Sequence, residues 1–197
     1  NKHNNMIDTS VNYLGLELKS PFIAASSGYT ADLEKIVALA RSGAGAIVLK
    51  SLFEEQISNE IGFLESVGAD SPESLDFLKR YVTDYSVGNY VKLIKDAKKE
   101  SGIPVIASIN CFSLSSWTDF AKEIEKAGAD ALELNIYSLP MNRESNSTEI
   151  ESGYWNIVNQ VTKELKIPVA VTISDNFTNI GNFVNGLQGH GAKGAVL

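Results

Sequence analysis

The sequence predicts an α/β fold built on a parallel sheet that curls into an incomplete eight-stranded β/α barrel. Short apolar runs alternate with amphipathic helical segments along the whole chain. A unit of helix, glycine turn and apolar strand also recurs, since residues 103–109 (IPVIASI) are echoed by residues 167–173 (IPVAVTI). An open doubly wound sheet is the alternative, but the first strand ends in Ser-Ser-Gly-Tyr and lacks the Gly-x-Gly-x-x-Gly turn of dinucleotide-binding sheets. The repeats favour the barrel.

The pattern of the N-terminal residues predicts a tail, a hairpin and the first strand-helix unit. Residues 1–10 are expected to be a tail, and residues 11–19 alternate around Gly15 as a small hairpin does. The apolar run at 22–25 is the first buried strand. The spacing then predicts a helix over 32–41, with Thr30 as its N-cap.

The next segment contains the second buried strand and a long excursion. Residues 46–49 form the strand, which leads directly into Lys50 and Ser51. Residues 53–85 are rich in Glu, Asp, Ser and Tyr, with helical patterns at 54–65 and 73–82. Long insertions after a strand often cover a site, so we expect this excursion to lie over the barrel mouth. Another helix is predicted at 89–99.

The remaining chain supplies four more strands, which makes six in total. They are predicted at 103–109, 131–136, 167–173 and 194–197, with helices at 117–126 and 154–165. The chain of 197 residues therefore reads as one partial barrel domain of about six β/α units with an N-terminal hairpin. A full barrel takes about 250 residues, so we expect either a piece of a longer protein or completion by another chain.

Composition narrows the classes of function. The formal net charge of −7 argues against a nucleic acid partner, because phosphate backbones bind clustered cations. No apolar run suggests a signal peptide or a membrane span, and a single cysteine excludes an internal disulfide, so a reducing, cytoplasmic setting is the expectation. Two separated histidines and one cysteine predict no metal site. The expected partner is a small molecule.

Polar residues gather at the carboxyl ends of successive predicted strands, where barrels of this type carry their active sites. The residues are Ser26, Ser27, Gly28, Lys50, Ser51, Asn110, Cys111, Asn135, Tyr137, Ser138, Thr172 and Ser174. Ordinary solvent-facing loop ends would also be polar, and Lys50 could instead pair with Glu54 or Glu55. Asn110 and Asn135 are the strongest candidates, because asparagine is depleted in strands and a buried amide needs partners.

Two further residues at this end of the sheet are expected to have structural and not catalytic roles. Glu133 lies on the opposite face from Leu134, which suggests an anchor that accepts backbone or lysine hydrogen bonds. Cys111 reads as a small buried apolar residue and not as a nucleophile.

Four segments together resemble the dihydroorotate dehydrogenase family and its dihydroorotate dehydrogenase-like branch, which are FMN-binding TIM barrels. They are residues 20–28 (SPFIAASSG), 45–51 (GAIVLKS), 103–110 (IPVIASIN) and 133–136 (ELNI), in the right order and at strand ends. The resemblance covers residues 11–197. It implies an FMN-dependent oxidoreductase that oxidises dihydroorotate to orotate in pyrimidine biosynthesis, with hydride passing to the flavin and a side chain removing a proton.

The resemblance also assigns roles by motif position. Cofactor contacts fall on Ala25, Ser26, Gly28, Lys50, Ser51, Asn110, Asn135 and Thr172, and substrate contacts on Lys50, Asn110, Asn135 and Asn142. The base falls on the loop after the fourth strand. Counting from Asn135 puts Ser138 at that position, whereas counting back from Pro140 puts Leu139 there, and leucine cannot take a proton.

Departures from the family pattern leave three hypotheses open. Thr172 stands where the family has a lysine that stabilises the reduced flavin, and the phosphate-binding loops after strands seven and eight are not in this sequence. The first hypothesis is an FMN-dependent oxidoreductase. The second is a non-catalytic or altered-substrate relative. The third is a half-barrel that needs a partner chain or a second copy as a homo-oligomer.

Overall fold

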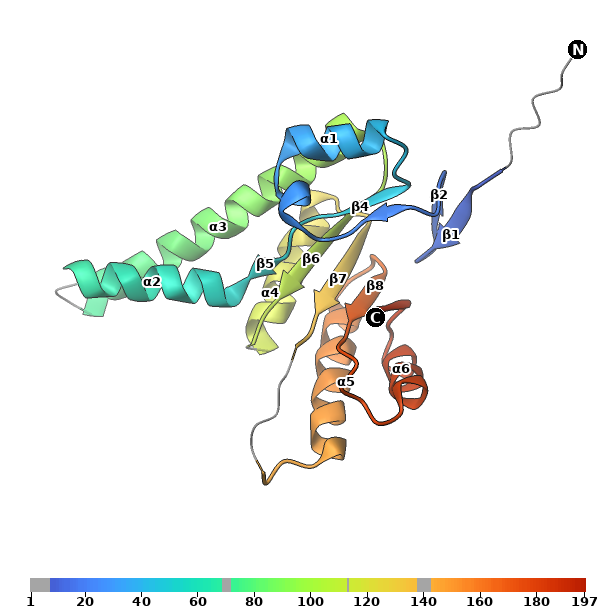
Figure 1. Cartoon of the computed structure of the whole chain (residues 1–197). Coiled ribbons are helices and arrows are strands. Elements are labelled where there is room, and N and C mark those ends of the chain that lie inside the picture. Colours follow the sequence, from blue (N-terminus) through green and yellow to red (C-terminus); the bar gives the residue numbers. More distant parts are fainter. Residues whose placement is uncertain (1–7, 69–71, 113, 138–142) are drawn as a thin grey trace, which may run out of the picture.

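A curled parallel sheet forms the centre of the molecule (Figure 1). The computed structural model describes residues 8–68, 72–112, 114–137 and 143–197. Its main strands follow the order β3-β4-β6-β7-β8-β9, with β5 paired beside β6, and every neighbouring pair is parallel. The bounds are β3 (Ile23–Ala24), β4 (Ala46–Val48), β5 (Leu52–Phe53), β6 (Val105–Asn110), β7 (Ala131–Asn135), β8 (Val169–Thr172) and β9 (Gly194–Val196). The predicted six-stranded half-barrel is confirmed, and β5 is an added short strand.

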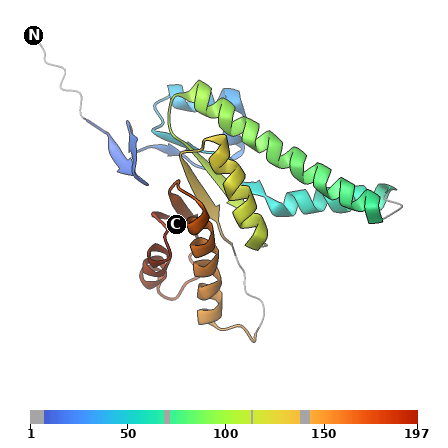
Figure 2. The ribbon, with the colours of Figure 1, turned by 180° about the vertical axis from the view of Figure 1, so that it is seen from behind.

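Helices cover the outer face of this sheet (Figures 1 and 2). The helical elements of the molecule are the 3₁₀ turn η1 (Gly28–Ala31), α1 (Leu33–Arg41), α2 (Glu54–Gly68), α3 (Pro72–Ser101), α4 (Leu114–Ala127), α5 (Ser147–Glu164) and α6 (Ile180–Gly189). Side chains alternate between the faces of a strand, so Leu132 and Leu134 point into the core beneath the helices. Glu133 and Asn135 therefore face the inside of the half-barrel.

The predicted hairpin is confirmed and closes the inside of the half-barrel at the amino ends of the strands. β1 (Val11–Tyr13) and β2 (Leu16–Leu18) pair antiparallel, and both turn residues, Leu14 and Gly15, have positive φ as a two-residue hairpin requires. Leu18 is only 1% exposed because it packs into a second core with the inner residues of the sheet. Those residues are Ala46, Val48, Ile106 and Ala131.

Several predicted helix boundaries are wrong. The N-cap of α1 is Asp32, whose carboxylate accepts the Lys35 N–H, while Thr30 lies buried in η1 and bonds the Ser27 backbone. The helices predicted at 73–82 and 89–99 are one helix, α3, because its buried face runs past the exposed Gly88 without a break. α5 starts at Ser147, seven residues earlier than expected, and α6 was not predicted.

Helix α2 and the N-terminal half of α3 form an antiparallel pair that projects beyond the sheet, which we call the arm (Figures 1 and 2). Ile57 and Val82, one from each helix, are 5% and 2% exposed and belong to the main core. The arm corresponds to the excursion predicted at 53–85. Its placement over the barrel mouth stays a prediction.

A gap in the sheet between β4 and β5 turns the Lys50–Ser51 segment away from the strand ladder. Val48 pairs with Ile106, and Leu52 pairs with Ile109. The three residues 49–51 therefore lie opposite only two residues of β6, 107 and 108, as in a β-bulge. The Tyr90 hydroxyl from α3 fills this gap, because it accepts the Ser108 N–H at 2.8 Å and donates to the Ser108 carbonyl at 2.9 Å.

Tyr90→Phe should lower the free energy of unfolding by about 1–3 kcal/mol, because both backbone groups of Ser108 would be buried without partners. Urea unfolding of the variant and the parent protein measures the change. Tyr29→Phe is the matched control, since Tyr29 is 69% exposed and should change stability by less than about 0.5 kcal/mol. Equal effects of the two substitutions would contradict the bridging role of the Tyr90 hydroxyl.

Candidate functional site

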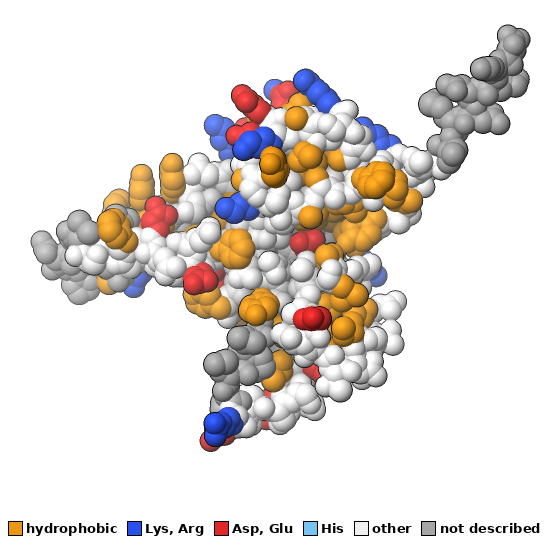
Figure 3. Space-filling model, viewed as in Figure 1, with side chains coloured by type: hydrophobic (Ala, Val, Ile, Leu, Met, Phe, Trp, Pro, Cys, Tyr) orange, Lys and Arg blue, Asp and Glu red, His pale blue; other side chains and the backbone are white. Residues whose placement is uncertain are grey.

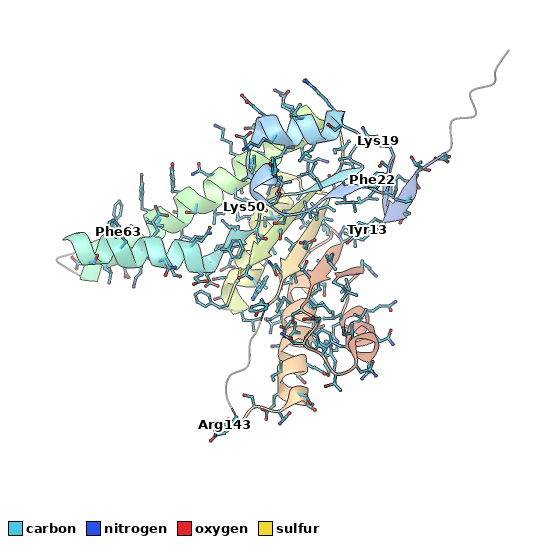
Figure 4. The ribbon with its side chains drawn as sticks, in the orientation of Figure 1. Tyr13, Lys19, Phe22, Lys50, Phe63 and Arg143 are labelled. Atoms are coloured by element: carbon cyan, nitrogen blue, oxygen red, sulfur yellow. The ribbon has the colours of Figure 1, made fainter. Side chains whose placement is uncertain are left out.

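A cavity of about 540 Å³ opens on the inner face of the half-barrel, toward the carboxyl ends of its strands. Tyr13 and Lys50, labelled in Figure 4, contribute to it from the hairpin and from the segment after β4. Its lining residues are Tyr13, Ile23, Ala25, Ser26, Ser27, Gly28, Val48, Lys50, Ser51, Phe53, Glu133, Asn135, Thr172 and Val196. The volume is in the range of small-molecule sites.

The structure brings most of the predicted cofactor residues together in this cavity. Those that line it are Ala25, Ser26, Gly28, Lys50, Ser51, Asn135 and Thr172. Asn110 does not line it, because its amide turns aside and donates to the Asn135 carbonyl at 2.8 Å, which fixes the end of β7. Ser138 and Asn142 lie outside the described residues. The ligand roles of all these residues stay predictions.

Three serine hydroxyls form a continuous line that runs from the cavity wall into the sheet. Ser26 Oγ lies 3.2 Å from Ser51 Oγ and accepts the Ser51 N–H at 3.0 Å. Ser51 Oγ in turn lies 2.8 Å from Ser108 Oγ, which is fully buried. Because Ser26 follows β3, Ser51 precedes β5 and Ser108 lies within β6, this line ties the β3 end and the Lys50–Ser51 segment to β6. It also leaves Ser26 at the cavity surface.

Glu133 places a carboxyl group at the floor of the cavity. It is 8% exposed, and Ser108 and Thr172 lie beside it on the neighbouring strands. Burial raises the pKa of Glu133, and the hydroxyls of Thr172 and Ser108 offset part of that rise. The expected anchoring by backbone or lysine hydrogen bonds is not found among the described residues. The alternation Glu133-x-Asn135 was the sequence signal for a cavity residue here.

Tyr13 is a second site residue that sequence reasoning missed. Its ring comes from the hairpin and lines the cavity near Glu133. Burial, and then the charge of Glu133, raises the pKa of the Tyr13 hydroxyl, so the phenol stays protonated. Only the docking of the hairpin under the sheet brings it to the cavity, so no local motif could have identified it.

Lys50 is an exposed cation at this site, and it forms no ion pair within the described part of the chain. The alternative pairing with Glu54 is wrong, because the Glu54 carboxylate accepts the Phe112 N–H at 2.8 Å and the Ser116 hydroxyl at 2.7 Å. Glu54 thereby fixes the loop between β6 and α4. The Lys50 ammonium therefore stays available to an anionic group of a ligand.

The remaining predicted features have structural roles or lie elsewhere. Cys111 is buried, and burial together with the Glu54 charge raises the pKa of its thiol, which suits an inert side chain. Over the described residues, no group of three or more His, Cys, Asp or Glu side chains could hold a metal ion. None of the helices in that same part of the chain is long and apolar enough to cross a membrane.

Comparison with known proteins supports the resemblance seen in the sequence. No protein-family model matches the chain. The catalytic subunit of dihydroorotate dehydrogenase B (NAD(+)) from Methanosarcina acetivorans is 31% identical over 199 residues, which cover 94% of this chain and 59% of that protein. The corresponding Thermoplasma volcanium subunit is 26% identical over 196 residues, covering 89% and 57%. Dihydroorotate dehydrogenase A (fumarate) from Lactobacillus helveticus is 26% identical over 207 residues, covering 98% and 63%.

The resemblance to dihydroorotate dehydrogenases is therefore confirmed, and the chain spans about three fifths of the length of these relatives. Among solved structures, an IMP dehydrogenase/GMP reductase-like protein from Corynebacterium glutamicum matches with a TM-score of 0.55 and 18% identity. That match covers 97% of this chain and 48% of the other protein. At this identity it supports the fold alone.

Glu133→Gln should stabilise the protein near pH 7, because glutamine carries no charge into the cavity. With its pKa raised above the ordinary 4.5, Glu133 keeps its proton in the folded chain at pH values where the unfolded chain has lost it. The parent protein therefore loses stability as pH rises from about 4.5 to the raised pKa, and stays less stable above it.

Urea unfolding between about pH 4 and pH 8 measures this effect. The stability difference between Glu133→Gln and the parent should shrink toward zero below about pH 4.5. Glu17→Gln, at an exposed position on β2, is the control and should show a much smaller pH-dependent difference. A constant difference at every pH would contradict the argument from burial of the carboxylate.

Proposed function

We propose that this chain carries the flavin-facing part of an FMN-dependent oxidoreductase that oxidises dihydroorotate to orotate. One observation carries the proposal: small and polar residues from the ends of β3, β4, β7 and β8 converge on one cavity. They are residues to which the family resemblance assigned flavin contacts. Relatives named dihydroorotate dehydrogenase, similar over 89–98% of the chain, support the same activity.

The cavity fits the ring system of a flavin. Its volume of about 540 Å³ accommodates a planar heterocycle. Along one wall the segment 25–28 carries only small side chains, and a Cβ added at Gly28 would meet nothing within 4 Å, so a ring can approach the backbone. The ammonium of Lys50 and the amide of Asn135 offer polar partners for the ring edge. These groups match what a flavin displays.

When bound, FMN would supply the two-electron acceptor of the reaction. The chain's own residues would bind, orient and move protons around it. Lys50 would neutralise negative charge on the cofactor or on the substrate carboxylate, since it has no protein partner within the described residues. Asn135 would hold an amide edge while its own carbonyl is fixed by Asn110. We assign the proton-accepting role to Ser138, which would need a proton path through water or Tyr137.

A non-catalytic or altered-substrate relative is the second candidate, and Thr172 is the observation that favours it. Thr172 takes the position of the family lysine, and it lies at the cavity floor beside the Glu133 carboxyl. Lys50 is the cation among the described lining residues, and its side chain is exposed to solvent. A floor without a cation stabilises an anionic reduced flavin less well. Flavin binding and catalysis can therefore be separate in this protein.

The proposed activity also implies a metabolic pathway and a cellular compartment. A dihydroorotate-oxidising enzyme serves pyrimidine biosynthesis, and we place it in the cytoplasm because one buried cysteine suits a reducing compartment. The net charge of −7 supports a small-molecule substrate over a nucleic acid partner.

The absorption spectrum of the purified natural protein that contains this chain tests the proposal. We expect the visible bands of a bound flavin, and loss of those bands when dihydroorotate is added without oxygen. A protein that stays colourless after incubation with FMN would overturn the FMN-dependent oxidoreductase. Bound flavin that dihydroorotate does not bleach would support the non-catalytic or altered-substrate relative.

Lys50→Met should weaken flavin or orotate binding about 10- to 100-fold, because a charge-assisted hydrogen bond contributes about 1.5–3 kcal/mol. Titration with FMN and with orotate, followed by flavin fluorescence, measures the two dissociation constants. Lys19→Met is the matched control, since Lys19 is exposed at the end of the hairpin and does not line the cavity (Figure 4). Unchanged constants for Lys50→Met would remove Lys50 from the site.

A further inference from the structure

A row of stacked aromatic side chains stands exposed on the arm, away from the cavity. Phe77, Tyr81 and Tyr85 of α3 are 68%, 58% and 58% exposed. Neighbouring rings stack on each other, with centroids 6.4 and 6.3 Å apart and interplanar angles of 20° and 13°. Figure 3 shows hydrophobic side chains standing off the arm into solvent, and Figure 4 labels Phe63 on the same arm.

The packing of the chain does not explain this row. The opposite face of α3 makes the contacts with the rest of the molecule, through Val82, Tyr90 and Ile94, which are at most 8% exposed. Large aromatic side chains gathered on an exposed surface mark an interaction site, since burying such rings is strongly favourable. We therefore expect a binding partner that covers this exposed face of α3.

We propose that the occupant is a second copy of this chain, with the row of one α3 packed antiparallel against the row of its partner. Phe77, Tyr81 and Tyr85 are spaced by four residues, so the row is symmetric about Tyr81. A two-fold axis beside Tyr81 makes the surface self-complementary: Phe77 meets the partner's Tyr85, and Tyr81 meets the partner's Tyr81.

The ends of the row permit close approach of the two helices. Ser74 and Gly88 lie seven residues before and after Tyr81, which places them on the same helix face two turns away. A Cβ added at Gly88 would meet nothing within 4 Å, so this position presents a flat backbone surface. Under the two-fold axis, Ser74 lies opposite the partner's Gly88, and two small residues face each other at each end.

The charges beside the row are also complementary under this symmetry. Arg80 and Asp84 are exposed on one flank of the row, and neither forms an ion pair within the described chain. A two-fold axis perpendicular to the plane of the two helices keeps each flank on its own side. Arg80 therefore lies about 3 Å along the helix axis from the partner's Asp84, at 1.5 Å per residue. Opposite charges meet twice, once on each side of the axis.

The area supports a reversible dimer. An aromatic side chain contributes roughly 150–250 Å², so at these exposures each ring of the row offers roughly 90–150 Å². Six rings, together with the two charged pairs, reach about 1,000 Å², the lower end for specific interfaces. We expect a dimer whose population depends on protein concentration.

Sedimentation velocity of the natural protein over a range of concentrations tests the association. We expect a monomer–dimer equilibrium that Tyr81→Lys shifts at least tenfold toward monomer, because two like charges would meet at the axis. Tyr29→Lys, at a tyrosine exposed to a similar degree on η1, should leave the equilibrium unchanged. A protein that is monomeric at every concentration, or a dimer that Tyr81→Lys leaves intact, would overturn the proposal.

Disulfide trapping in a Cys111→Ala background tests the register. Tyr81→Cys should cross-link to itself under mild oxidation. Phe77→Cys alone should not, since two copies of that position lie about 12 Å apart along the axis, beyond the reach of a disulfide. Mixing Phe77→Cys protein with Tyr85→Cys protein should restore cross-linking. Self-linking of Phe77→Cys as fast as Tyr81→Cys, or no link at Tyr81, would refute the antiparallel contact.

Discussion

The hydrogen bonds between the Tyr90 hydroxyl and the backbone of Ser108 join the main parts of this molecule. Without them, the gap between β4 and β5 would leave two polar backbone groups of the fully buried Ser108 unpaired, which is costly. With them, the Lys50–Ser51 segment can leave the ladder and face the cavity. The same residue fixes α3 against the sheet, so the base of the arm and one wall of the site share one anchor.

The inside of the half-barrel contains buried polar groups that lower the stability of the fold. Its lower layer is apolar and closed by the hairpin through Leu18, whereas the layer above carries Ser108, Glu133 and Thr172. Burying a carboxyl group there is unfavourable, and the neighbouring hydroxyls offset only part of the effect. Conflicts of this kind between burial and polarity are typical of functional sites. The outer core beneath the helices is built from aliphatic and aromatic side chains.

The two halves of α3 have different roles. The half near Tyr90 packs on the sheet and supports the cavity, while the half on the arm presents aromatic rings to solvent. A contact between arms would join two molecules without occupying either cavity. It would also leave the open edge strands of the sheet, β3 and β9, outside the interface.

The sequence by itself determined the fold class, the hairpin and the strand ends, because period-two apolar runs and glycine turns are local signals that survive folding. It also placed Lys50, Ser51 and Asn135 at a shared site, since parallel strands carry their carboxyl ends to one edge. Only the tertiary structure decided that Asn110 turns away toward the Asn135 carbonyl and that Tyr13 lines the cavity. Those outcomes depend on which neighbours meet across strands and under the hairpin, and such long-range contacts leave no mark in the local sequence pattern.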